Sequence, residues 1–587
     1  MLKLLKFLKP LKYFAALTVF LSLANNALQL LLPTLMADLV NIGISNGDRD
    51  FIFQKGLWMI AISAVSTFAA VGTSYCSSRT ATGFGRTVRG AVFKKVESLS
   101  QCDIDKIGTP SLITRNTNDI NKIQEMLIAI LRTVIAAPVL MVGGVFMAFR
   151  MNRKLSMVLF IVIPVISLIA FLIARRVIPM FRLMQLKTDS LNKILREKLT
   201  GIRVIRAFNR SQYEDNRFKR SNEELTQLAF RIARIFAGLM PLVVLLLFGL
   251  LVLIVYIISG QLNALDPGIP LQNLEIKNTV GNLQAFIVYL TMIIYAVSLA
   301  AEMLIMLPRA SISARRINEV LDIETKIKEP LSPARTVKGE GRVLEFTGVS
   351  FSYPGAGQPA LTGIDFSAKS GETTAIIGGT GSGKSTLVSL IPRFYDVTEG
   401  SVCIDGVDIR TMRTGDLHDK IGFIPQKTFL FSGTVADNLS FGLQGASEER
   451  MWEALETAQA AEFVRELPYG LYDMISQNGK NLSGGQQQRL AIARALIRPA
   501  AFYIFDDSFS ALDFKTDLTL RKGLKKELKD AAVIIVAQRI GTIMDADRIL
   551  VLDEGRIVGD GKHRELMENC AVYREIAVSQ LSGEELA

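Results

Sequence analysis

The stretch Gly378-Gly-Thr-Gly-Ser-Gly-Lys-Ser-Thr386 decides the fold of the C-terminal part of this 587-residue chain. It fits the pattern GxxxxGK[ST], follows the β-rich run Thr373–Ile377 and precedes a helix with apolar patterning. In such a loop the glycines let backbone N–H groups surround phosphate oxygens, and the helix N-terminus adds its dipole. The sequence therefore predicts a phosphate-binding loop at a turn from strand to helix.

Side chains of this loop and of a later strand are suited to binding ATP and Mg²⁺. Lys384 would reach the β- and γ-phosphates, and Ser385 would ligate Mg²⁺. Asp506 ends the buried-strand run Phe502–Phe505, and a carboxylate in that position is the usual partner of the metal ion. The nucleotide-binding residues that we predict in the loop are Gly378, Thr380, Gly381, Ser382, Gly383, Lys384, Ser385 and Thr386.

A second Gly-rich helix start, Ser483-Gly-Gly-Gln486, lies between the loop and Asp506 and is followed by Gln-Gln-Arg-Leu. This segment resembles the signature of ABC transporter ATPases. The resemblance implies that Ser483, Gly484, Gly485 and Gln486 grip a γ-phosphate from the opposite side. It also implies that Tyr353 stacks on adenine, that Gln426 senses both Mg²⁺ and the membrane domain, and that Ser510–Asp513 crosses between two nucleotide domains.

Six stretches before residue 310 are long and apolar enough to span the roughly 30 Å of hydrocarbon in a bilayer. They are 13–36, 55–77, 127–149, 155–174, 235–260 and 284–307. We therefore predict an α-helical six-span transmembrane domain plus an α/β P-loop ABC nucleotide-binding domain. The expected boundaries are 1–325, a linker at 326–340, and 341–587. The chain as a whole resembles exporter-type half-transporters, and Leu199–Phe208 resembles a segment of their second cytoplasmic loop.

The positive charges predict the orientation in the membrane. Lys3, Lys6, Lys9 and Lys12 precede the first span without an acidic residue among them. The connections 78–126 and 175–234 are long and basic, whereas the short basic loop 150–154 opposes this orientation. We expect a multi-pass plasma membrane protein with a cytoplasmic N-terminus and ATP domain. We attribute the net charge of +12 to Lys and Arg residues in these loops. We do not attribute it to nucleic-acid binding, because the sequence contains no nucleic-acid-binding motif.

Two local features of the membrane half leave alternatives open. Gly108-Thr-Pro110 would turn the chain, so Asp105–Arg115 is either a contact with the ATP domain or a plain turn. Arg132 and Glu302 are ionisable residues inside predicted spans. Such residues usually face a water-filled cavity, a partner or a substrate. The alternative is that their side chains extend to the membrane interface.

Two positions depart from the ABC family pattern. Directly after the strand that ends in Asp506, the family usually carries a Glu, which acts as the base that polarises the attacking water. This chain has Asp507 at that position. Displacing a reacting group by about 1 Å can cost roughly 100-fold in rate, and Asp is one methylene shorter. The family also has a His at the end of the next strand, and this chain has Gln538, which cannot carry the charge of His⁺. Neither His418 nor His563 is placed to substitute.

These departures predict that the chain binds ATP well and hydrolyses it weakly at its own loop. In the family, each site combines the loop of one chain with the signature of the other. We therefore expect one subunit of a heterodimeric exporter of amphipathic small molecules, lipids or peptides. Gln477 stands where related exporters often carry a Glu that contacts the partner. The alternatives are a homodimer that tolerates Asp507 and Gln538, an importer with an exporter fold, and an ATP-gated channel or regulatory subunit.

Overall fold

The structure is a computed structural model that describes residues 2–263, 270–325, 327–330, 332–334 and 343–580. The chain divides into two compact units. We call the first, Met1–Glu97 with Thr109–Ile323, the helical unit. We call the second, Ser98–Gly108 with Glu324–Ala587, the α/β unit. A short piece of the N-terminal half is therefore part of the second unit.

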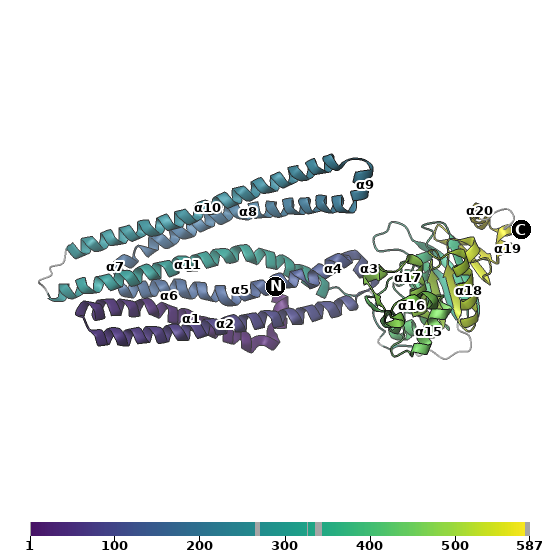
Figure 1. The fold of residues 1–587 in the computed structure, drawn as a ribbon, viewed down its shortest axis with the longest axis horizontal. Coiled ribbons are helices and arrows are strands. Elements are labelled where there is room, and N and C mark those ends of the chain that lie inside the picture. The colour runs from purple at the N-terminus through teal and green to yellow at the C-terminus, as the bar shows by residue number, and fades with distance from the viewer. Residues whose placement is uncertain (1, 264–269, 326, 331, 335–342, 581–587) are drawn as a thin grey trace. The chain divides into compact units, whose positions relative to one another are not determined.

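The helical unit is built from long helices that run alongside one another (Figure 1). Figure 1 also shows α8 and α10 side by side as a hairpin that is closed by α9. Buried Val177 on α8 packs with Leu228 and Ile232 on α10 in this hairpin. The bounds are η1 (Leu2–Leu11), α1 (Lys12–Asp38), η2 (Leu39–Ile44), α2 (Arg49–Glu97), α4 (Thr109–Asn116), α5 (Asn118–Ala129), η3 (Ile130–Val134), α6 (Ile135–Met151), α7 (Arg153–Ser156), α8 (Leu159–Thr200), α9 (Ile202–Ala207), α10 (Ser211–Asn263) and α11 (Pro270–Leu321).

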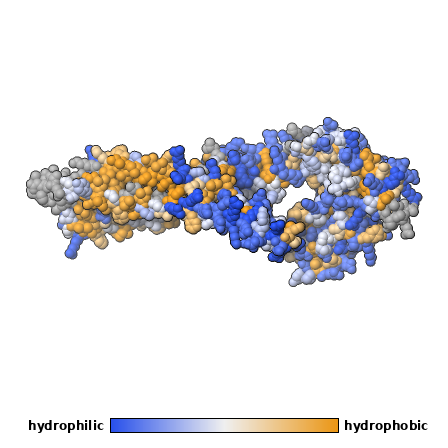
Figure 2. Space-filling view, turned by 90° about the horizontal axis from the view of Figure 1, so that it is seen from above, coloured by the Kyte–Doolittle hydropathy of each residue, from blue (hydrophilic) through white to orange (hydrophobic). Residues whose placement is uncertain are grey.

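Among the described residues, five helices are long and apolar enough to cross a membrane. They are Lys3–Ile44, Arg49–Glu97, Thr109–Met151, Leu159–Thr200 and Val280–Ala300, and they overlap five of the predicted spans. The predicted span 235–260 lies on α10, where a shorter apolar helix, Phe248–Gly260, is found. Figure 2 shows hydrophobic surface gathered over one part of the helical unit. This surface suits contact with lipid hydrocarbon.

Polar contacts join α1 and the η2 turn that follows it to α11, inside the apolar part of the helical unit. The Tyr289 hydroxyl donates to the Leu30 carbonyl oxygen over 2.8 Å. Farther along, the Gly281 N–H donates to Asn41 Oδ1 over 2.9 Å. A Cβ added to Gly281 would lie 2.4 Å from that Oδ1 atom. Only glycine therefore permits this approach of the two helices.

The α/β unit contains a six-stranded sheet with the order β12-β11-β3-β10-β9-β6 and a four-stranded sheet with the order β2-β1-β4-β5. Strands β3, β10 and β9 are parallel neighbours, and β9 and β10 are buried throughout. Continuous apolar runs are typical of strands that are covered on both faces. The strands are β1 (Val343–Phe351), β2 (Leu361–Lys369), β3 (Thr373–Gly378), β4 (Glu399–Ile404), β5 (Val407–Asp408), β6 (Ile421–Ile424), β7 (Gly433–Thr434), β8 (Met474–Ile475), β9 (Phe502–Asp506), β10 (Ala532–Val536), β11 (Arg548–Asp553) and β12 (Arg556–Gly561).

Helices cover these sheets and enclose two apolar cores, one of which contains Leu387 and Ile504 and the other Ile492 and Phe505. The helices are α3 (Gln101–Ile107), α12 (Lys384–Leu390), α13 (Thr414–Asp419), α14 (Val435–Ser440), α15 (Glu448–Thr457), α16 (Ala461–Glu466), η4 (Gly470–Tyr472), η5 (Gln477–Gly479), α17 (Gly484–Leu496), α18 (Phe514–Glu527), η6 (Ile540–Thr542), α19 (His563–Asn569) and α20 (Ala571–Gln580).

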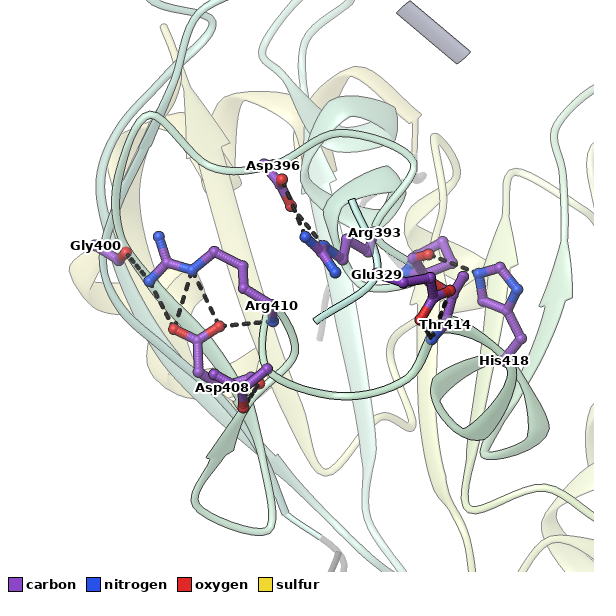
Figure 3. Close-up of polar contacts among 10 residues, drawn as sticks. Glu329, Arg393, Asp396, Gly400, Asp408, Arg410, Thr414 and His418 are labelled. Carbon is purple, nitrogen blue, oxygen red and sulfur yellow. Dashed lines mark hydrogen bonds and ion pairs between the residues drawn. The ribbon is translucent and has the colours of Figure 1, made fainter. Parts of the chain in front are cut away.

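The segment that follows the helical unit is fixed to α13 by one carboxylate (Figure 3). Both Glu329 carboxylate oxygens accept from the Thr414 N–H at 3.3 Å, and this hydrogen bond lowers the pKa of Glu329. Beside it, Arg393 pairs with Asp396 over 2.7 Å. Most of the predicted linker, 326–340, lies outside the described residues.

Candidate functional site

The phosphate-binding loop predicted from the sequence lies between β3, which ends at Gly378, and α12, which begins at Lys384. Gly383 has a φ of +99°, a conformation that disfavours a side chain. A Cβ there would lie 2.8 Å from Leu361 Cδ2 and 2.9 Å from the Ala360 carbonyl oxygen. The predicted turn from strand to helix is confirmed, and its tight curvature requires glycine at this position.

The Lys384 ammonium group lies over the loop. Its Nζ atom donates to the carbonyl oxygens of Gly378 at 2.8 Å and Gly379 at 2.7 Å. Burial lowers the pKa of Lys384, and the nearby carboxylates of Asp507 and Asp506 partly offset this effect. A buried cation held by carbonyl oxygens is well placed to bind phosphate, because an anionic oxygen is a stronger acceptor than a carbonyl.

Ser385 and Asp506 form a small oxygen-rich pair beside the loop. The Ser385 hydroxyl donates to Asp506 Oδ1 over 2.9 Å. Burial raises the pKa of Asp506, so a cation that bound there would favour its ionised form. Among the described residues no cluster of three or more His, Cys, Asp or Glu could hold a metal. One hydroxyl and one carboxylate nevertheless fit Mg²⁺, which commonly takes few protein ligands together with water and substrate phosphates.

Gln538 and Gln426, two of the residues that the sequence analysis singled out, both contact one oxygen atom of a third, Asp507. Asp507 Oδ2 accepts from Gln538 Nε2 at 2.9 Å and from Gln426 Nε2 at 3.4 Å. Asp507 has a φ of +49°, and burial is the main cause that raises the pKa of its carboxyl group. A pocket of about 280 Å³, lined by Asp507, Gln538, Ser510 and Arg539 among others, opens at this point.

Tyr353 lies on the α12 side of the loop. Its hydroxyl is 3.0 Å from Thr386 Oγ1, and 38% of the residue is exposed. Its ring meets the ring of Tyr395 edge to face, with centroids 5.5 Å apart. This exposure leaves ring surface on which a base can stack.

Tyr395 connects this aromatic group to α3. Its hydroxyl donates to Asp105 Oδ2 over 2.9 Å, and burial followed by this hydrogen bond raises the pKa of Tyr395. Of the two alternatives left open for Asp105–Arg115, contact with the ATP domain is therefore the one that Asp105 adopts. Arg115, at the other end of the predicted contact segment, instead pairs with Glu319 of the helical unit at 3.1 Å. No motif in the sequence points to Tyr395.

The signature segment begins α17 with a capping box. Gln486 N–H donates to Ser483 Oγ at 3.3 Å, and Ser483 N–H donates to Gln486 Oε1 at 2.9 Å. The next residues join this helix to the strand end that carries Asp507. Ala511 N–H donates to Gln488 Oε1 at 3.2 Å, and the Ser510 hydroxyl donates to the Asp507 carbonyl oxygen at 3.0 Å. These two hydrogen bonds link α17 to Asp507 through Ser510 and Ala511, and neither involves Ser483–Gln486 itself.

Other predicted residues lie apart from this set. In the part of the chain that the structure describes, no hydrogen bond or ion pair joins Ser483–Gln486 to Gly378–Thr386. His418 Nε2 lies 2.9 Å from the Pro392 carbonyl oxygen, and His563 Nδ1 contacts the Tyr573 hydroxyl. Neither histidine lines the pocket at Gln538, as expected. The side chain of Glu302 lies outside the described residues.

Comparisons with known proteins agree with this geometry. Residues 15–297 match the ABC transporter transmembrane region and residues 361–510 match the ABC transporter family. An uncharacterized ABC transporter ATP-binding protein of Mycobacterium tuberculosis is 40% identical over 98% of this chain and 97% of its own length. An ATP-dependent lipid A-core flippase of Hahella chejuensis is 29% identical over 99% of this chain and 97% of its own length.

A solved structure gives the same fold over nearly the full length. It is a bacterial Atm1-family ABC exporter with ATP bound, and it matches with a TM-score of 0.76 and 24% identity. The match covers 98% of this chain and 99% of that one. A transmembrane helical region is followed by the ABC nucleotide-binding fold in both. This chain belongs to the ABC transporter family and has the exporter-type fold.

Proposed function

We propose that the protein is one half of an ATP-driven exporter that is assembled from two different half-transporters. Its loop, Gly378–Thr386, binds ATP, and its signature, Ser483–Gln486, completes the competent site of the partner. We assign residues 1–325 to the membrane domain and 341–587 to the ATP domain. In support, the loop and the signature share no hydrogen bond within the described chain, so each is free to face a second chain.

The proposal that ATP is hydrolysed weakly at the chain's own loop rests on one observation, the hydrogen bonds that Asp507 accepts. Its Oδ2 atom is held by the amides of Gln538 and Gln426, and no histidine lies in the pocket beside it. The carboxylate is one methylene shorter than the usual Glu and points its oxygen at amides. A base must come within hydrogen-bond reach of the water that it activates. ATP therefore stays bound here for longer than at the partner's site.

Ser385 and Asp506 would hold Mg²⁺ at this loop, with Gln426 close to the same strand end. The ion supplies charge neutralisation of the β- and γ-phosphates. Lys384 supplies further positive charge when it exchanges the Gly378 and Gly379 carbonyl oxygens for phosphate oxygens. Tyr353 orients the base by stacking. Together these residues support tight ATP binding without requiring efficient hydrolysis.

Exposed apolar side chains at the tip of the α8–α10 hairpin support the proposal that a second chain binds this protein. Helix α9 has no buried residue. The neighbouring apolar side chains Leu199, Val204 and Phe208 are 74%, 60% and 75% exposed. Exposed apolar patches of this kind mark interaction sites. Because this connection is also strongly basic, we propose that it lies in the cytoplasm with the N-terminus and the ATP domain.

Amphipathic molecules are the proposed substrates, and export is the proposed direction. The exporter-type fold and the Hahella chejuensis relative, which is named as a lipid A-core flippase, support an amphiphile that partitions into the bilayer. Export requires that ATP turnover tracks with outward flux of the solute. Inward flux would identify an importer, and flux without coupled turnover would identify a gated channel.

The test is to purify the full chain alone and after co-expression with a neighbouring half-transporter, and to trap nucleotide with vanadate and a photoreactive ATP analogue. We expect a one-to-one complex in which trapped nucleotide labels the partner more than this chain. Ser483→Ala should abolish trapping on the partner. Ser447→Ala is the matched control, because Ser447 caps α15 through the Arg450 N–H with the same backbone geometry.

Two results would overturn the proposal. One is a homodimer of this chain that hydrolyses ATP rapidly without a partner, because Asp507 and Gln538 would then suffice for hydrolysis. The other is unchanged trapping in Ser483→Ala, because the signature would then contribute nothing to the opposite site.

A further inference from the structure

A cavity of about 380 Å³ with both polar and apolar lining residues lies in the helical unit, among α1, α2, α5, η3, α6 and α11. Its wall includes Asn25, Asn26 and Gln29 from α1, together with Glu125 and Arg132. These residues belong to helices that are apolar enough to cross a membrane. Ionisable residues at such positions usually mark a substrate or ion pathway. The cavity is therefore a candidate substrate site, and this inference rests on the function proposed above.

The α1 amides are held in place by their neighbours. Asn26 Nδ2 donates to the Ser22 carbonyl oxygen at 2.6 Å. Asn25 Oδ1 accepts from the Ser66 hydroxyl of α2 at 2.8 Å. These bonds give the cavity a fixed polar wall before any ligand enters, and a preorganised wall loses less entropy on binding.

Arg132 lies in an irregular segment of its helix. It belongs to η3 (Ile130–Val134), a π-helical turn between α5 and α6. Single π-helical turns are rare and occur often at functional sites, because the extra residue redirects the side chains. Here the turn is in the stretch predicted as the third span, and Arg132 lines the cavity. The backbone irregularity and the charge thus coincide at one position.

Glu125 and Arg132 give the cavity both signs of charge. They are seven residues apart, which on a helix is about two turns and roughly 10 Å along the axis. Both are exposed to the cavity side and, among the described residues, neither forms an ion pair. A purely anionic ligand would meet repulsion from Glu125, and a purely cationic ligand would meet repulsion from Arg132. A ligand without charge would leave both groups uncompensated in an apolar region.

We propose that this cavity binds a zwitterionic amphiphile. Its anionic group pairs with the Arg132 guanidinium, which suits phosphate or carboxylate. Its cationic group lies toward Glu125, and its apolar chain extends along Ala136, Leu140 and Leu299, which line the same cavity. The volume accommodates a polar head with the first part of a chain, within the range usual for small-molecule sites.

The test uses the full chain with the half-transporter that co-purifies with it, in uncharged maltoside micelles. The probe is lysophosphatidylethanolamine with a fluorophore on its acyl chain, and binding is followed by anisotropy. Competitors of equal chain length are unlabelled lysophosphatidylethanolamine, anionic lysophosphatidylglycerol and a cationic alkyltrimethylammonium. We expect the zwitterion to compete about tenfold better than either singly charged amphiphile.

Substitutions test the contributions of Arg132 and Glu125 separately. Arg132→Gln should weaken probe binding about tenfold, and Arg132→Lys should restore part of it. Glu125→Gln should remove the preference for the zwitterion over lysophosphatidylglycerol. Lys122→Gln is the matched control, because Lys122 is an exposed cation on α5 that does not line the cavity. Equal competition by all three amphiphiles, or equal effects of Arg132→Gln and Lys122→Gln, would overturn the proposal.

ATP binding and turnover are measured on the same preparations. If the complex assembles and turns over ATP but shows no preference among the three amphiphiles, the cavity proposal fails and the proposed function stands. If the chain neither pairs with a second half-transporter nor takes part in ATP turnover, the proposed function fails whatever the probe shows.

Discussion

Gln538 Nε2 donates a hydrogen bond to Asp507 Oδ2 over 2.9 Å, between the ends of two adjacent parallel strands. Both residues differ from the Glu and His that the ABC family usually has at these positions. The two departures are therefore one local arrangement, in which a short carboxylate and a neutral amide satisfy each other. A Gln amide is neutral, so it offers the γ-phosphate a hydrogen-bond donor but no positive charge.

The first prediction reverses both departures. Asp507→Glu with Gln538→His should raise ATP turnover at this chain's loop by about 10- to 100-fold, because it extends the base by one methylene and restores a group that can be charged. The measurement is vanadate-trapped nucleotide on this chain, separated from the partner by size. Each single variant is the control and should give a smaller increase. Unchanged trapping in the double variant would mean that these positions do not limit hydrolysis.

Sequence alone predicted the local features of the site. The loop pattern predicted the turn from strand to helix at Gly378–Thr386, and the Gly-rich segment Ser483–Gln486 predicted the helix start that begins α17. The pairing of Ser385 with Asp506 follows because parallel strands end at the same edge of a sheet. These features depend on neighbours in sequence or on a recurring topology.

Contacts between distant segments were not predictable in the same way. The sequence offered Asp105–Arg115 as a possible contact with the ATP domain, but nothing in it pointed to the partner Tyr395, 290 positions away from Asp105. The hydrogen bond that the Thr414 N–H donates to Glu329 joins the predicted linker to the short helix α13. The π-helical turn at Ile130–Val134 also escapes hydropathy, because one inserted residue barely changes the apolar pattern. Such features depend on packing, which the pattern of residue types leaves open.

The second prediction concerns Tyr353. Tyr353→Ala should weaken ATP binding about tenfold or more, since stacking of a base on an aromatic side chain contributes roughly 1–3 kcal/mol. Tyr353→Phe loses only the hydroxyl contact with Thr386 and should change affinity little. Calorimetric titration with ATP and with inorganic tripolyphosphate distinguishes the causes. Equal weakening of both ligands in Tyr353→Ala would indicate damage to the loop and no role for the ring in stacking.

The third prediction concerns the backbone of the loop. Gly383→Ala should lower the thermal stability of the α/β unit, because a left-handed conformation costs a non-glycine residue about 1–2 kcal/mol. The new Cβ would also lie 2.8 Å from Leu361 Cδ2. Gly379→Ala is the control in the same loop, since a Cβ there has nothing within 4 Å. Scanning calorimetry without nucleotide is the measurement, and equal unfolding temperatures for the two variants would contradict the structure.

The fourth prediction uses the raised pKa of Asp506. A buried carboxyl group whose folded-state pKa lies above 3.8 stabilises the fold when protonated, and this contribution is lost as pH rises through the folded-state pKa. Asp506→Asn keeps an acceptor for Ser385 and removes the charge. Without nucleotide, the variant should therefore be more stable than the wild type at neutral pH. The difference should disappear as pH falls below the ordinary carboxyl value.

The same variant should lose most of the stabilisation that Mg²⁺ and ATP together give the wild type, because the carboxylate would no longer be available to the ion. Unfolding temperatures at neutral and acidic pH, with and without the ion and ATP, test both parts. A variant that is less stable than the wild type at neutral pH would show that the Asp506 charge is compensated within the protein.

The last prediction concerns the hydrogen bond between Tyr395 and Asp105. Burial and the carboxylate raise the pKa of Tyr395, so its hydroxyl stays protonated and donates throughout the physiological range. Tyr395→Phe removes this donor, whereas the ring that meets Tyr353 remains. The loss of one such bond, about 1 kcal/mol, should speed amide hydrogen exchange in α3 about fivefold.

Hydrogen exchange followed by mass spectrometry on the full chain measures α3 directly. Tyr472→Phe is the matched control, because the Tyr472 hydroxyl donates to Glu448 elsewhere on the same unit and should leave α3 unaffected. Adding ATP to the wild type should slow exchange in α3, since a base stacked on Tyr353 restricts the ring that Tyr395 contacts. In Tyr395→Phe this effect of ATP should shrink. If ATP protects α3 equally in both proteins, the aromatic pair does not connect the nucleotide to this helix, and α3 must respond through other contacts.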